Sequence, residues 1–320
     1  MDTNRFERQR TYNRLQSALL VGLMSALVAY VGWFLGGGST AILALGLVLV
    51  SYALAPRLSP RLVLRLFRGR MIDPGEAPQL YAAMGQIAAR AGLERVPRLF
   101  YVPSDVMNAF AVGDRDNAVI ALSDGILRRM SLEETAAVLA HEASHVAHND
   151  LRVMGFADVT ERFTRVMSLF GQILLLVNLP LMLMGAVTIS WIPIVVLIFA
   201  PTLSALAQLA LSRTREYNAD LGAARLLGDP EPMARALSKM ERFQGRFLEQ
   251  VIGPGQRLPD PSLLRTHPPT EERIRRLLEL RESSAFRRST PLALGGVPDH
   301  GRVMAPSRLP PRWHASGTWY

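Results

Sequence analysis

Three of the six histidines in this 320-residue chain fall in one short run, His141-Glu142-Ala143-Ser144-His145-Val146-Ala147-His148. Its first five residues match the pattern H-E-x-x-H. Two histidines four residues apart on a helix share one face, with Cβ atoms about 6 Å apart, and can bind one Zn²⁺ between them. Glu142 then lies close enough to take a proton from a zinc-bound water. The run predicts metal-assisted hydrolysis, with His141 and His145 as ligands and Glu142 as general base.

His148 offers a second way to complete such a site. It lies three residues beyond His145 and seven beyond His141, on the same face. However, it sits one turn further along the axis, and one straight helix cannot wrap three ligands tetrahedrally around a single ion. The position six residues after His145 is Leu151, so a third histidine does not occur there either. We expect the third ligand from another helix, with His148 as a polar neighbour.

The histidines can act together only if a helix carries them. Ser131 and Glu134 form a capping-box pattern, and neither proline nor glycine follows through Asp150. Apolar residues recur at steps of three and four, with alanines between them. The pattern predicts a helix that starts after Ser131, packs closely against its neighbours and reaches Asp150. A buried helix whose histidines merely satisfy core hydrogen bonds is the competing interpretation.

Two further carboxylates stand four residues apart, Glu216 and Asp220, in the run Arg213-Thr214-Arg215-Glu216-Tyr217-Asn218-Ala219-Asp220. A zinc site with two histidines commonly takes a carboxylate as third ligand and leaves a fourth position for water. Ligating histidines also donate their second N–H to a carboxylate. Glu216 as ligand and Asp220 behind a histidine would serve both needs. The alternative is that these are ordinary carboxylates paired with Arg213 and Arg215 at a membrane edge.

Hydrophobic residues make up 49% of the chain and are unevenly placed. No charged residue occurs between Arg14 and Arg57, nor between Arg165 and Arg213. Each gap can hold two membrane-spanning helices of about 20 residues with a tight turn between them. Residues 36–40 and 185–193 are the expected turns. The competing interpretation, pairs of buried core helices, fits these lengths poorly.

Arginines indicate the orientation. Four precede the first apolar gap and five follow it: Arg5, Arg8, Arg10, Arg14, Arg57, Arg61, Arg65, Arg68 and Arg70. By the positive-inside rule, both termini and the region between the two hairpins are cytoplasmic, in a multi-pass protein of the plasma (inner) membrane. The net charge of +9 then reflects topology and attraction to anionic lipid. No nucleic-acid recognition motif is found. The lack of cysteine excludes disulfides and thiolate ligands.

The rest of the chain completes the predicted organisation. Residues 77–91 are expected to form an amphipathic helix, and 98–102, 109–112 and 118–122 short strands, the last two as a hairpin. Helices are expected at 211–227, 233–243 and 269–281. The predicted segments are a cytoplasmic N-terminal segment (1–14), a first transmembrane hairpin (15–56), a first catalytic part with the H-E-x-x-H helix (57–165), a second hairpin (166–212), a second catalytic part with the third ligand (213–282) and a mostly disordered tail (283–320).

Four stretches together resemble the HtpX-type membrane zinc metalloproteases. They are the His141–His145 run followed by Asp150, the segment 212–220, Asn108-Ala109-Phe110-Ala111, and His267-Pro268-Pro269-Thr270-Glu271-Glu272-Arg273-Ile274. The resemblance covers the chain from the first span to about residue 278. It implies zinc held by His141, His145 and Glu216, Glu142 as general base, and Asp220 behind His141. It also implies that Asn108 binds the substrate backbone, that His267 stabilises the oxyanion, and that Arg273 ties a late helix to the site.

The sequence thus predicts a mainly α membrane protein with four transmembrane helices and a cytoplasmic zincin-like (gluzincin) α+β catalytic domain with a small sheet. The expected activity is zinc-dependent hydrolysis of peptide bonds in membrane proteins or unfolded polypeptides near the bilayer surface. The resemblance further suggests quality control of damaged membrane proteins under stress. Two alternatives stand beside this prediction: a protease of the CAAX prenyl-protein type, and a non-proteolytic membrane scaffold with an inactive motif.

Overall fold

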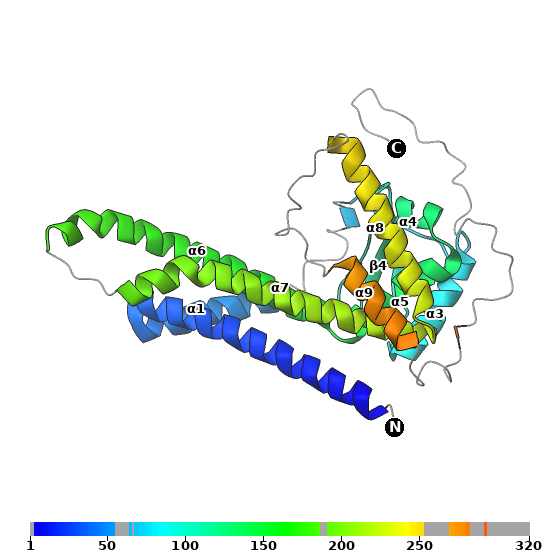
Figure 1. Ribbon diagram of the computed structural model, residues 1–320, viewed down its shortest axis with the longest axis horizontal. Helices are drawn as coiled ribbons and strands as arrows, with labels where there is room; N and C mark the ends of the chain where they lie inside the picture. The colour runs from blue at the N-terminus through cyan, green and yellow to red at the C-terminus, as the bar shows by residue number, and fades with distance from the viewer. Residues whose placement is uncertain are drawn as a thin grey trace.

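A computed structural model describes residues 3–54, 64–65, 67–185, 191–252, 269–281 and 291–292 of the chain. Three long helices lie side by side in an elongated arm: α1 (Thr3–Leu54), α6 (Asp150–Leu183) and α7 (Trp191–Leu227) (Figure 1). A compact part at one end of this arm holds a small sheet and shorter helices. The structure is mostly helical, as predicted, and α7 extends without a break from the arm into the compact part.

All three long helices are long and apolar enough to cross a membrane, over Leu15–Val50, Asp150–Leu183 and Ile194–Leu227. Their outward faces carry exposed large apolar side chains, among them Leu43, Leu176 and Phe199. Their inward faces form shared clusters; one contains Val28 and Leu197. Apolar residues therefore lie on both the packed and the exposed faces, as expected of helices surrounded by lipid.

Helix α1 changes direction within its apolar stretch. Gly36 and Gly37 leave helical geometry, and Gly37 has a φ of 75°. Residues 32 and 41 would be about 13 Å apart along a straight helix. Instead, a Cβ atom built on Gly32 would lie 3.0 Å from the Cα of Ala41 and 3.1 Å from the Cβ of Ala44. The chain therefore doubles back, and small residues let its two arms pack closely.

The compact part is built on a four-stranded mixed sheet in the order β1-β2-β4-β3. The strands are β1 (Arg70–Met71), β2 (Arg98–Val102), β3 (Ala109–Val112) and β4 (Val119–Ser123). The pair β3–β4 is antiparallel, which confirms the predicted hairpin, while β2 and β4 are parallel. Strand β4 is central and buried throughout, whereas β3 forms an edge. The two-residue strand β1 was not predicted.

Helices α3 (Pro78–Ala91) and α5 (Leu132–Ala147) pack with the sheet in the main core. Helix α3 ends where predicted, because Gly92 adopts the left-handed conformation with φ of 66°. A short helix α4 (Asp124–Arg129), α8 (Glu231–Ile252) and α9 (Thr270–Arg281) complete the fold. Within the predicted tail, Leu292 is only 8% exposed, and its backbone N–H donates to the carbonyl of Leu227 at 2.7 Å.

Candidate metal centre

Helix α5 begins as its sequence predicts. The Ser131 hydroxyl accepts a hydrogen bond from the backbone N–H of Glu134 at 3.3 Å, and the Glu134 carboxylate accepts one from the N–H of Ser131 at 2.9 Å. The helix ends earlier than expected, at Ala147 rather than Asp150. Asn149 adopts a left-handed conformation with φ of 56°, which asparagine tolerates better than most residues, and α6 then starts at Asp150. A tight turn therefore separates α5 from the arm.

Three predicted ligands from two helices meet at one point. The Nε2 atoms of His141 and His145 are 3.2 Å apart. Glu216, on α7, places one carboxylate oxygen 3.5 Å from Nε2 of His141 and the other 3.7 Å from Nε2 of His145. His141 and Glu216 are each 6% exposed. Among the described residues these three side chains form the group that could hold a metal ion.

The spacing of these atoms fits a small tetrahedral cation. Ligand atoms bonded to zinc at about 2.0–2.1 Å in tetrahedral geometry lie about 3.3 Å from one another. The separations of 3.2, 3.5 and 3.7 Å bracket that value. Each histidine turns its Nδ1 toward a carboxylate, which only accepts, so in the neutral rings each Nε2 directs a lone pair toward the gap. Two lone pairs and a carboxylate facing one another are stable only around a positive charge.

Asp220 lies behind His141, and Arg273 connects α9 to this pair. Oδ1 of Asp220 lies 3.1 Å from Nδ1 of His141. Arg273, on α9, donates two hydrogen bonds of 2.7 Å to Asp220, and its third nitrogen lies 3.2 Å from Glu216. The Arg273 fork therefore fixes one carboxylate that orients a histidine and another that belongs to the ligand group.

The electrostatics of this cluster favour a cation. Burial alone would lower the pKa of His141, but hydrogen bonds and charge from Asp220 and Glu216 outweigh it and raise the pKa to about 10. Burial also opposes the charged form of Arg273, whereas Asp220, Glu216 and Glu142 raise its pKa. The site concentrates negative charge in a buried place and holds a proton there when no metal competes.

Glu142 and His148 occupy the positions that the helix pattern indicates. Glu142 follows His141 on α5, is half-buried, and lies close enough for its charge to act on Arg273. His148 is exposed at the C-terminal end of α5, and its Nδ1–H donates to the carbonyl of Ser144 at 2.8 Å. It belongs to the helix end and lies outside the ligand group.

Asn108 lies immediately before the edge strand β3. Its backbone N–H donates to the Ser123 hydroxyl, and its carbonyl accepts from the N–H of Ser123, both at 3.0 Å. Its side chain is exposed. Strand β3 packs beside α5 in the main core, so an edge of the sheet runs past the helix that carries the histidines. His267 lies outside the described residues.

Two features of the site escaped sequence reasoning. The alternative interpretation paired Arg215 with Glu216 or Asp220, whereas the structure places its Nη1 2.6 Å from Oδ1 of Asp150. Gly222 allows α7 to touch α5, because a Cβ atom there would lie 2.0 Å from the Ser144 hydroxyl oxygen. An isolated glycine inside a helical pattern is a signal of such close approach.

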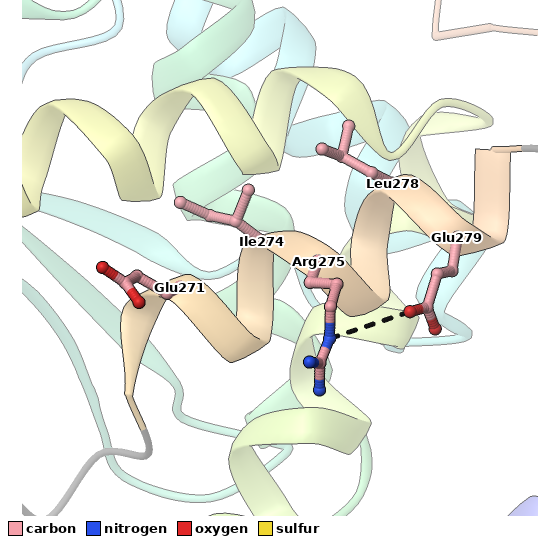
Figure 2. A pocket seen from close by; sticks show the side chains of 5 residues that line it. All are labelled: Glu271, Ile274, Arg275, Leu278 and Glu279. Atoms are coloured by element: carbon pink, nitrogen blue, oxygen red, sulfur yellow. Dashed lines mark ion pairs between the residues drawn. The ribbon is translucent and has the colours of Figure 1, made fainter.

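An open hollow of about 400 Å³ on α9 is separate from this centre (Figure 2). It is lined by Glu271, Ile274, Arg275, Leu278 and Glu279. In this hollow, Nε of Arg275 lies 3.7 Å from Oε1 of Glu279. The buried Arg273 and Leu277 lie on another face of the helix. The hollow therefore contains none of the candidate ligands.

Fold and site together define the class of this protein. Two histidines and a glutamate converge on a buried point on and beside the helix that carries Glu142, and the chain carries long apolar helices on either side of this motif in sequence. This combination is that of a membrane metallopeptidase.

Comparisons with known proteins make the assignment specific. Residues 74–281 match the model of peptidase family M48. A protein described as "Protease HtpX homolog" from Paraburkholderia phytofirmans is 33% identical over 297 residues, which cover 86% of this chain and 99% of that protein. One of the same description from Desulfatibacillum aliphaticivorans is 33% identical over 301 residues, or 87% and 93% of the two chains. The chain belongs to peptidase family M48 and is a membrane metalloprotease.

A solved structure is also similar. The "Crystal Structure of S. mikatae Ste24p" is 20% identical in sequence, with a TM-score of 0.49, and the match covers 84% of this chain and 66% of that one.

Proposed function

We propose that this protein is a zinc endopeptidase in which His141, His145 and Glu216 hold the ion and Glu142 is the general base. The observation that carries the proposal is the convergence of two histidine nitrogens 3.2 Å apart and the Glu216 carboxylate, with ligand atoms within 4.8 Å of one another. Three protein ligands with an open fourth position are typical of catalytic rather than structural zinc. Imidazole and carboxylate groups are common ligands of zinc, and a site of two histidines and one glutamate needs no thiolate to bind it.

The chain's own residues carry the proton transfers and the positioning. When bound, zinc supplies Lewis acidity, polarising the scissile carbonyl and making water nucleophilic near neutral pH. Glu142 accepts the proton of the attacking water and then delivers it to the leaving amine. Asn108 and the edge strand β3 bind the substrate as an added strand, which presents an extended backbone to the site. His267 donates to the developing oxyanion. Asp220 and Arg273 keep His141 oriented.

We place the catalytic part at the cytoplasmic surface of the plasma membrane, with four spans and both termini inside. The reversal of α1 at Gly36 and Gly37 supports two crossings in the first hairpin, and α6 and α7 supply two more. Arginines cluster where the first hairpin ends. Because Glu216 lies on α7, the helix that leaves the membrane, the metal centre lies near the bilayer. The substrates are therefore membrane proteins or unfolded polypeptides held near this surface.

Metal analysis combined with proteolysis tests the chemistry. Glu142→Gln should retain a full complement of zinc in detergent yet lose casein and membrane-protein cleavage by about 10²-fold or more. Glu216→Ala should lower zinc content, because one of the three ligands is removed. A fully active Glu142→Gln variant would refute the general base. Purified wild type without zinc would favour a scaffold, and cleavage restricted to prenylated peptides would favour a CAAX-type specificity.

Single cysteines test the topology cleanly, because the chain contains none. Ser39 is exposed beside the reversal of α1, and Asp116 is exposed in the loop between β3 and β4. With four spans, Ser39→Cys should react with a membrane-impermeant maleimide on intact cells. Asp116→Cys should react only after permeabilisation. Labelling of both from the same side would contradict the proposed arrangement.

A further inference from the structure

Asp150 lies directly behind the second histidine, because the chain turns within two residues after α5. His148 is the C-cap of α5, Asn149 takes the left-handed conformation, and Asp150 is the first residue of α6. The turn brings Oδ2 of Asp150 to 3.0 Å from Nδ1 of His145. Asp150 is only 2% exposed. A buried carboxylate therefore accepts the second N–H of this histidine.

The other carboxylate oxygen of Asp150 is held by Arg215, on the neighbouring helix α7. Oδ1 lies 2.6 Å from Nη1 of Arg215, whose side chain is 14% exposed. Arg215 immediately precedes Glu216 on α7. The ion pair joins residues 65 positions apart, one at the start of α6 and the other on α7. The ion pair thus joins the start of α6 to α7 beside the metal ligands.

We propose that Asp150 is a positioning residue for His145 and that Arg215 holds Asp150 in place, so that metal coordination depends on how α6 and α7 pack. This inference rests on the proposed metal site. A carboxylate that accepts the distal N–H of a ligating histidine fixes its tautomer and ring orientation, and losing it typically lowers metal affinity about 10- to 100-fold. Arg215 keeps the buried carboxylate compensated, since an uncompensated buried charge is strongly destabilising.

A purely structural role for Asp150 is the competing explanation. An acidic residue in the first turn of a helix stabilises it through the helix dipole by about 0.3–1 kcal/mol. Such a role would affect thermal stability and leave the geometry of the metal ligands unchanged. The two roles therefore differ in metal affinity and in the spectrum of a bound ion.

The test uses the full-length protein in detergent, with zinc affinity measured by chelator competition and the visible spectrum recorded after cobalt substitution. Asp150→Ala and Asp150→Asn should weaken zinc binding, the former about 10- to 100-fold, and should shift the cobalt bands. Arg215→Gln should act in the same direction. Arg215→Lys should largely restore binding, because the contact uses one nitrogen. The matched control is Asp158→Ala, which removes an exposed α6 carboxylate paired with Arg162 at 3.0 Å.

Several outcomes overturn the inference. Wild-type affinity and an unchanged cobalt spectrum in a folded Asp150→Ala variant would remove the positioning role. If that variant does not fold, the same result in Asp150→Asn decides against it. Additive losses in the Asp150→Asn/Arg215→Gln double variant would show that Arg215 does not act through Asp150. A wild type that binds no zinc would overturn the proposed function itself, which is a distinguishable failure.

Discussion

Replacing Gly222 by alanine should damage the metal centre without touching a ligand. Gly222 lies on α7, two residues beyond Asp220 and six beyond Glu216, and it faces Ser144 on α5, between the two histidines. A Cβ atom there would lie 2.0 Å from the Ser144 hydroxyl oxygen and 2.8 Å from its Cβ. The hydroxyl can rotate away, but the Cβ can move only with the backbone of α5.

The size of the disturbance follows from these contacts. Ordinary carbon–carbon contact begins near 3.4 Å, so a contact of 2.8 Å requires α5 and α7 to separate by about 0.6 Å. Metal–ligand distances tolerate only about 0.2 Å. Overpacking of this kind costs about 1–3 kcal/mol, which corresponds to roughly 5- to 150-fold in zinc affinity if all of it appears at the site. In open space, the same change would stabilise a helix by up to about 1 kcal/mol.

Zinc affinity and thermal unfolding of three variants give the answer. Gly222→Ala should bind zinc more weakly than wild type. Adding Ser144→Gly should restore much of the affinity, because it removes both clashing atoms. Gly85→Ala on α3 is the matched control, since a Cβ there meets no atom within 4 Å, and it should raise stability slightly. Wild-type zinc affinity in Gly222→Ala, or no rescue by Ser144→Gly, would refute the idea that this contact sets the distance between the ligand helices.

Three further changes probe the same molecule. Leu292→Ala should lower the free energy of unfolding by about 2 kcal/mol in denaturant titrations, because Leu292 is buried, whereas Leu278→Ala, at a position 44% exposed, should have little effect. The pKa of His141 is raised to about 10, so zinc must displace a proton from this residue at neutral pH. Zinc affinity should therefore rise about tenfold per pH unit between about pH 6 and 9. A zinc affinity that calorimetry finds unchanged over this pH range would contradict this reasoning. Arg273→Lys should weaken zinc binding because lysine cannot form a fork, whereas Arg275→Lys, 69% exposed, should not.

The local part of the site follows from the sequence. Ser131 and Glu134 form both hydrogen bonds of the predicted capping box, and four-residue spacing places His141 and His145 with their Nε2 atoms 3.2 Å apart. These features depend on neighbours within one or two helical turns, where propensity and periodicity act directly. The predicted hairpin of β3 and β4 is confirmed for the same reason.

The long-range part does not follow from spacing alone. Periodicity shows that Glu216 and Asp220 share a face of α7, but not which element that face meets; the resemblance to a family supplied the partner. For the same reason, spacing does not identify the carboxylate that Arg215 contacts. The sequence allows a neighbouring carboxylate equally well, whereas the structure pairs Arg215 with Asp150. The early end of α5 depends on Asn149 adopting a left-handed conformation, a choice that helix propensity does not reveal.

The two histidines are supported in parallel ways from different directions. Asp220 orients His141 and is held by an arginine of α9, while Asp150 orients His145 and is held by Arg215 of α7. Each histidine therefore depends on helices of the arm, because Asp150 lies on α6 and both Arg215 and Asp220 lie on α7. The helix α5 supplies two of the three candidate ligands, but the complete centre cannot form from α5 alone. Metal affinity is consequently a measure of how completely the membrane arm and the compact part have assembled, and it links folding in the bilayer to the appearance of a peptidase site.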